Sequence, residues 1–125
     1  MCHAAGRRLE KVHVFINTGR FRSFEELREF VDETYTEDGD GVPSPFMREV
    51  GLTEYEPACI EAIHGEAPTT VAALLAGASY ADQWLAKVDG SRVADSAICV
   101  FAPNRVAHPR GSSLEYVGAY AYETR

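Results

Sequence analysis

The sequence predicts one α+β domain: a mostly antiparallel sheet of three to four strands with helices packed on it, in the order β-α-α-β-α-α-β-β. Its 125 residues are a usual length for one domain with one core. Hydrophobic residues make up 46% and charged residues 25% of the chain, a globular composition that argues against disorder. Segments in which apolar residues alternate with period two are interspersed with segments in which they recur at helical spacing, and this mixture predicts the α+β class.

The first predicted element is a β-strand over residues 11–18, in which apolar residues alternate. Phe15 falls on the opposite side from the other apolar residues, so we expect both faces of this strand to be partly covered. Residues 1–10 show no period. We therefore expect a flexible N-terminal leader over 1–10 and a single domain over 11–125.

A helix is predicted after Ser23, because Ser23 and Glu26 form a capping box. Apolar residues recur on one arc of this helix: Phe24, Leu27, Val31 and Tyr35. Acidic residues occupy the opposite arc: Glu25, Glu26, Glu29, Asp32 and Glu33. The pattern predicts a helix that continues to Tyr35, with one apolar face and one acidic face.

A loop and a short element follow this helix. Residues 37–41 are rich in Asp and Gly and indicate a loop. Residues 43–45 lead into a short turn or helix that ends near Gly51. Residues 58–63 indicate a strand, and Pro57 before them favours a position at the edge of the sheet.

Two short helices are predicted next. Thr69 or Thr70 is expected to cap a helix that runs through Leu75. Ser79 is expected to cap a second helix over residues 80–88, because polar capping residues precede an apolar-periodic segment there.

Two strands are predicted at the end of the chain, over residues 97–102 and 114–122. The connection over 103–113 is rich in Pro, Gly, Arg and Ser, which predicts that these two strands form one long antiparallel hairpin. We expect the helices to group on one face of the sheet.

The cysteines and the apolar runs bear on the compartment. Cys2, Cys59 and Cys99 cannot all pair within one chain, which fits a reduced compartment, and Cys59 and Cys99 are expected to pack as small hydrophobic thiols. The longest apolar run, 71–78, is far shorter than the ~20 residues that span a bilayer. No apolar region follows the N-terminal arginines, so we expect no secretory signal, no membrane contact and a cytoplasmic protein.

The net charge of −7 is unevenly distributed. Between Glu25 and Glu66 there are 13 acidic residues against Arg28 and Arg48 alone, a balance of −11, whereas the rest of the chain has six acids and ten bases, a balance of +4. Such a region repels nucleic acid and acidic membranes and attracts a basic partner. We therefore expect a protein partner and no nucleic acid.

Catalytic and metal-binding motifs are incomplete in this chain. His64 and Glu66 match the first half of a zinc-deaminase signature, but the second half, P-C-x-x-C, is missing. Asp38, Asp40 and Glu49 fall on three positions of a calcium loop, but Pro43 stands where that loop requires Gly. We expect no metal, no cofactor and no enzyme activity.

A protein-binding surface is the interpretation that remains for the acidic helix and loop; the competing interpretation is a solvated acidic face that serves solubility. Charge gives steering, and nearby aromatic residues supply anchors. The predicted partner-binding residues are Glu29, Asp32, Glu33, Tyr35, Asp38, Asp40 and Tyr55.

Several segments taken together carry a family resemblance: Val12-His13-Val14-Phe15-Ile16 leading to Phe24-Glu25-Glu26-Leu27, Tyr35 with its acidic loop and Ser44-Pro45-Phe46, Tyr55-Glu56, Leu74-Leu75 with Ser79-Tyr80, and the closing Tyr116-Val117-Gly118-Ala119-Tyr120. In this pattern the chain resembles the Immunity protein 22 family of bacterial polymorphic toxin systems over residues 11–122. The resemblance implies an α+β immunity protein that binds and blocks the catalytic domain of a cognate toxin in the producing cell, without enzyme activity of its own.

Three questions stay open at the level of sequence. The toxin is expected to be basic, and a nuclease would fit, because its active surface must hold phosphates. A monomer and a homodimer are both compatible with the sequence. The alternative function is a small enzyme or a ligand-binding regulatory domain with a site of Cys, His and Glu residues assembled in space.

Overall fold

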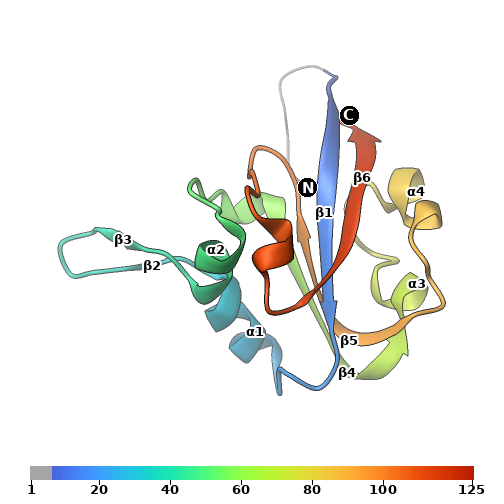
Figure 1. Ribbon diagram of the computed structural model, residues 1–125, viewed down its shortest axis with the longest axis horizontal. Coiled ribbons are helices and arrows are strands. Elements are labelled where there is room, and N and C mark those ends of the chain that lie inside the picture. The colour runs from blue at the N-terminus through green and yellow to red at the C-terminus, as the bar shows by residue number, and fades with distance from the viewer. Residues whose placement is uncertain (1–6) are drawn as a thin grey trace.

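The computed structural model describes residues 7–125, which form a four-stranded antiparallel sheet with helices on both of its faces (Figure 1). The order of strands across the sheet is β4-β5-β1-β6, and β2 and β3 form a separate two-stranded hairpin. The strands are β1 (Leu9–Asn17), β2 (Thr34–Tyr35), β3 (Gly41–Val42), β4 (Ile60–Thr70), β5 (Val93–Val100) and β6 (Glu115–Glu123). The helices are α1 (Phe24–Val31), α2 (Pro45–Val50), α3 (Val71–Leu74) and α4 (Ala81–Trp84), with 3-10 turns η1 (Pro57–Cys59), η2 (Leu85–Lys87) and η3 (Pro109–Gly111).

Helices cover the two faces of the sheet in pairs. On one face, residues of α1 and α2 pack with Phe15 of β1 in a buried cluster that also contains Ile98 and Val100. On the other face, α3 and α4 contribute Val71 and Trp84 to a cluster with the opposite side of β1. The α+β class and the antiparallel sheet are confirmed, but the prediction that the helices group on one face is wrong.

The central position of β1 explains its sequence. Val12 and Val14 are buried in the α3 and α4 cluster, and Phe15 is buried on the opposite face. Because β1 pairs with β5 on one side and with β6 on the other, β5 and β6 are not neighbours. The predicted hairpin between the last two strands is therefore wrong. The 103–113 connection passes over β1 instead.

Helix α1 ends four residues earlier than predicted. Ser23 caps it by accepting a hydrogen bond from the Glu26 amide at 3.1 Å, which is one of the two bonds of the predicted capping box. At the other end, Asp32 adopts an extended backbone with φ −83° and ψ 133°, and Tyr35 pairs with Gly41 in the β2–β3 hairpin. The predicted order of elements omitted this hairpin, and the placement of Tyr35 on the apolar face of a helix is wrong.

Two further predicted helix ends are confirmed. Thr70 accepts a hydrogen bond from the amide of Ala73 at the start of α3, and Gly51 ends α2 in the left-handed conformation with φ +68°. The strand expected at the sheet edge is β4, which is an edge strand.

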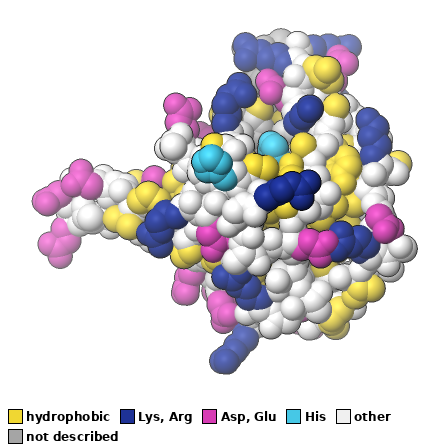
Figure 2. Space-filling view, viewed as in Figure 1, with side chains coloured by type: hydrophobic (Ala, Val, Ile, Leu, Met, Phe, Trp, Pro, Cys, Tyr) yellow, Lys and Arg dark blue, Asp and Glu magenta, His cyan; other side chains and the backbone are white. Residues whose placement is uncertain are grey.

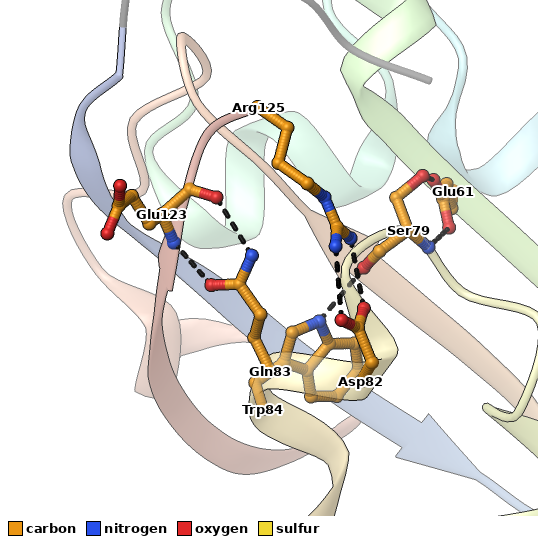
Figure 3. A network of polar contacts seen from close by, with 7 residues as sticks. All are labelled: Glu61, Ser79, Asp82, Gln83, Trp84, Glu123 and Arg125. Carbon is orange, nitrogen blue, oxygen red and sulfur yellow. Dashed lines mark hydrogen bonds and ion pairs between the residues drawn. The ribbon is translucent and has the colours of Figure 1, made fainter.

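Ser79 does not cap α4. Its amide and hydroxyl donate to the Glu61 carboxylate, and its carbonyl accepts from the Trp84 indole at 2.9 Å (Figure 3). Gln83 bonds both backbone groups of Glu123, at 2.6 Å and 2.9 Å. These bonds hold the short α4 against the sheet.

The ends of the chain and the cysteines differ in part from expectation. Residues 1–6 of the expected leader lie outside the described residues, and β1 begins at Leu9, inside the expected leader. Cys99 is a buried free thiol as predicted, but Cys59 is disulfide-bonded, so the prediction that Cys59 packs as a free thiol is wrong. Within residues 7–125, no helix has the length and apolar character needed to span a membrane.

Candidate partner-binding surface

The β2–β3 hairpin projects from the body of the protein (Figure 1). Its turn is held by Thr36, whose amide donates to the Asp40 carbonyl at 2.9 Å and whose hydroxyl accepts from the Asp40 amide at 3.1 Å. Gly39 lies at the turn with φ +86°, a conformation that costs little only for glycine. The Asp and Gly residues that predicted a loop therefore form the tip of an ordered hairpin.

Acidic side chains dominate this projection. The segment from Glu33 to Val42 contains four acids, Glu33, Glu37, Asp38 and Asp40, and no lysine or arginine occurs between Arg28 and Arg48. Within residues 7–125, none of these four carboxylates forms an ion pair. Figure 2 shows the acidic side chains gathered at the outer end of the projection. The tip of the hairpin therefore presents negative charge, whereas Arg48 lies at its base, where it donates to the Pro43 carbonyl at 3.1 Å.

Two apolar side chains are exposed on the same hairpin: Tyr35, 65% exposed, and Val42, 38% exposed. The Glu33 carboxylate accepts a hydrogen bond from the Tyr35 hydroxyl and raises the pKa of Tyr35. Glu33 also lies against Gly41, since a Cβ on Gly41 would be 3.1 Å from its carboxylate oxygen. Tyr35 is thus exposed to solvent beside the Glu33 carboxylate.

The base of the hairpin is fixed by Asp32. Its carboxylate accepts two hydrogen bonds from Arg28, at 2.5 Å and 3.0 Å, and one from the Tyr55 hydroxyl at 2.5 Å. Burial and the Asp32 carboxylate together raise the pKa of Tyr55. The Arg28 guanidinium also lies 6.0 Å from the ring centre of Phe24, which is 47% exposed. A continuous strip of charged and aromatic side chains therefore joins the outer surface of α1 to the hairpin.

The predicted partner-binding residues fall into two groups. Glu33, Tyr35, Asp38 and Asp40 lie together on the hairpin, and Glu29 is exposed on α1. Asp32 and Tyr55 are bonded to each other at its base. Sequence reasoning missed Arg28, although its spacing of four residues from Asp32 was a signal for an ion pair on a helix.

The whole −11 region is not one surface. Glu49 accepts bonds from the amide and hydroxyl of Ser113, and Glu61 is bound by Ser79. These carboxylates connect distant segments of the chain and do not belong to the hairpin.

The alternative of a catalytic site was tested on the arrangement of reactive side chains. Cys99 is fully buried, and burial raises the pKa of its thiol, so it is not an accessible nucleophile. Among residues 7–125, no cluster of three or more His, Cys, Asp and Glu side chains is placed to hold a metal. His64, of the H-x-E half motif, lies on β4 with Nε2 3.0 Å from the Phe21 carbonyl oxygen, where it has a structural role.

One groove contains a histidine with a shifted pKa. It has a volume of about 430 Å³ and is lined by β1, β6 and the 102–106 segment. His13 lines it, with Nδ1 3.0 Å from the Tyr116 hydroxyl oxygen, and burial followed by the charge of Lys11 lowers the pKa of His13. The lining residues include no Ser, Thr or Cys. The groove is therefore suited to binding and lacks a hydroxyl or thiol nucleophile.

Comparison with known proteins gives a family match. A family model described as Immunity protein 22 matches residues 14–123 of the chain, so the match covers the helices, the hairpin, strands β4, β5 and β6, and the second half of β1. No curated protein and no solved structure matches the chain.

Proposed function

This chain belongs to the Immunity protein 22 family, and we propose that it binds and neutralises a cognate bacterial toxin domain through the β2–β3 hairpin and the adjoining surface of α1. Membership of this family implies immunity function in general. Beyond this general function, we propose which surface binds the toxin, that the toxin is basic, and that binding takes place in the cytoplasm of the producing cell.

The observation that carries the proposal is the projecting hairpin, which combines unpaired carboxylates with an exposed Tyr35. Carboxylates at the outer end steer a basic partner during encounter. The exposed Tyr35 supplies an aromatic anchor, and a tyrosine loses little rotamer entropy when it is buried on binding. A face that only served solubility would not need an exposed aromatic side chain beside its carboxylates.

The predicted residues then have two roles. Glu29, Glu33, Asp38 and Asp40 contribute charge at the interface, and Tyr35 is the anchor. Asp32 and Tyr55 hold the hairpin in place and act through it, because their polar groups are already bonded to each other.

The partner is inferred to be basic. A nuclease toxin fits this inference, since a surface that holds nucleic-acid phosphates is basic and would be covered by the acidic hairpin. The chain itself needs no cofactor and no catalytic activity in this role. It acts by occupying the surface of another protein.

Co-expression with the toxin encoded beside the gene tests the proposal. We expect wild-type protein to prevent killing and to co-purify with the toxin, and the Asp38→Lys and Asp40→Lys double variant to lose protection. The matched control is Glu54→Lys with Glu66→Lys, which changes the net charge by the same amount at two exposed positions outside the hairpin. Continued killing with wild-type protein, without a complex, would refute immunity through this partner.

The alternative, a ligand-binding or enzymatic domain, is favoured by one observation, the His13 groove. Native mass spectrometry of the purified protein tests it. A stoichiometric small molecule that is lost from the His13→Ala variant would support the alternative, and protein of the unliganded mass alone would count against it.

A further inference from the structure

The groove lined by His13 lies on the part of the sheet that α1 and α2 leave open. Leu9, Lys11 and His13 alternate along β1 with Phe15, so they share the face that these helices cover lower down. Ala121, opposite Lys11 on β6, continues the floor, and the 102–106 segment forms one wall. The groove is thus an uncovered extension of a packed face.

The groove combines positive charge with apolar surface. Lys11 and Arg105 are exposed, and neither forms an ion pair within the described part of the chain, whereas Glu10 is the only carboxylate among the lining residues. Leu9 is 77% exposed and Val106 is half-buried. An exposed apolar side chain beside cations without ion pairs is complementary in charge and polarity to an acidic segment that also carries apolar side chains.

A small molecule would find few groups to orient it in this groove. The Asn104 amide, which is buried, is already bonded to the backbone of Glu56 at 2.8 Å and 3.0 Å. The charged groups that remain stand at the exposed rim. This arrangement selects for charge and apolar contact and not for a particular small ligand.

The hairpin of the same protein has the complementary chemistry. It carries Glu37, Asp38 and Asp40 at its exposed end, beside the exposed side chains of Tyr35 and Val42. Figure 1 shows that the hairpin points away from the strands that carry the groove, so it is presented to another molecule and not to its own groove. Figure 2 shows Lys and Arg side chains over the body and at the inner end of the projection, apart from the acidic tip.

We propose that the hairpin of one copy docks in the groove of a second copy, with Asp38 and Asp40 facing Lys11 and Arg105 and with Tyr35 against Leu9. When both hairpins dock at once, the two copies form a closed symmetric dimer, whereas one-way docking would continue into longer chains. The contact is small, so the dimer is weak and dissociates on dilution. Dimerisation covers the hairpin when no toxin is present, and a toxin that binds the hairpin separates the two copies.

Sedimentation velocity of the purified protein from about 10 μM to about 1 mM tests the dimer without any toxin. The wild-type protein is expected to dimerise as its concentration rises. The Asp38→Lys, Asp40→Lys variant and the Lys11→Glu, Arg105→Glu variant are each expected to weaken dimerisation by at least about tenfold. The Glu54→Lys, Glu66→Lys control should dimerise like the wild type, and circular dichroism checks that every variant is folded.

The hairpin variant separates specific docking from general repulsion. It reduces the magnitude of the net charge of −7 by four units, so repulsion between whole molecules predicts stronger association, whereas our proposal predicts weaker association. An equimolar mixture of the two double variants should form a heterodimer, since the reversed hairpin then meets the reversed groove and the two unaltered surfaces also match.

A wild-type protein that stays monomeric up to about 1 mM would overturn the proposed dimer. A hairpin variant that dimerises as well as the wild type, or a mixture that stays monomeric, would also overturn it. None of these results bears on toxin binding, which is measured separately by co-expression.

Discussion

The Tyr55 hydroxyl lies 2.5 Å from Oδ1 of Asp32, at the residue where α1 ends and the chain turns toward the hairpin. The same carboxylate is held by Arg28 from the preceding turn of the helix. This contact ties the hairpin base to the segment before β4, 23 residues along the chain. The position of the hairpin therefore depends on a bond that is remote from its exposed tip.

Tyr55→Phe is expected to lower the free energy of unfolding by about 0.5–1.5 kcal/mol, a modest amount because the Tyr55 side chain is only partly buried. The hairpin base should loosen, and toxin binding should weaken although no contacting residue has changed. Urea unfolding and titration calorimetry measure the two effects. A variant that matches the wild type in both would show that the Asp32 contact does not position the hairpin.

The stability of the protein should fall at alkaline pH, and Tyr55 should contribute to this fall. Because its pKa is raised by folding, Tyr55 keeps its proton in the folded state at a pH where the unfolded chain has lost it. Its contribution is complete below the unfolded pKa of about 10 and is lost as the pH rises above that value.

Urea unfolding between about pH 9 and pH 11 measures this dependence. Tyr116, Tyr120 and Tyr122 also have raised pKa values, so the wild type loses stability through several groups. Tyr55→Phe should make the fall less steep without abolishing it. An unchanged slope in that variant would contradict the assignment to Tyr55.

Tyr35→Ala should separate binding from stability. Tyr35 is 65% exposed, and its removal leaves the buried clusters intact, so the unfolding midpoint should stay close to that of the wild type. If Tyr35 is an anchor, the dissociation constant for the toxin should rise by about 30-fold or more. Tyr35→Phe, which keeps the ring and loses the bond to Glu33, is the intermediate variant. If Tyr35→Ala and the wild type bind the toxin with equal affinity, Tyr35 does not lie in the interface.

Local signals predicted much of the fold because they act within a few residues. Ser23 and Thr70 carry side-chain oxygens that cap the helices after them, and Gly51 adopts the left-handed conformation that ends α2. In β1, Phe15 lies on the opposite face from the alternating valines, which predicted a strand covered on both faces, and both faces are buried.

The hairpin and the strand order could not be predicted in the same way. Tyr35 continues the helical spacing of Val31, and only the pairing of Tyr35 with Gly41 makes it part of a strand. The two final strands looked like neighbours, but the buried faces of β1 favour a central position, and a long connection can pass over it. The acidic region was defined by sequence alone, so it also included Glu49 and Glu61, whose carboxylates bond Ser113 and Ser79 inside the fold.

The connection over β1 can be tested at its closest approach to α2. A Cβ on Gly111 would lie 2.4 Å from the carbonyl oxygen of Glu49, a backbone atom that cannot move without shifting α2. Gly111→Ala is therefore expected to destabilise the protein by about 1–3 kcal/mol. Gly77→Ala is the matched control, since a Cβ there meets no atom within 4 Å, and it should leave stability nearly unchanged. Thermal unfolding compares the two. Ser113, near the end of this connection, also bonds Glu49. A Gly111→Ala variant as stable as Gly77→Ala would mean that the connection does not lie against α2.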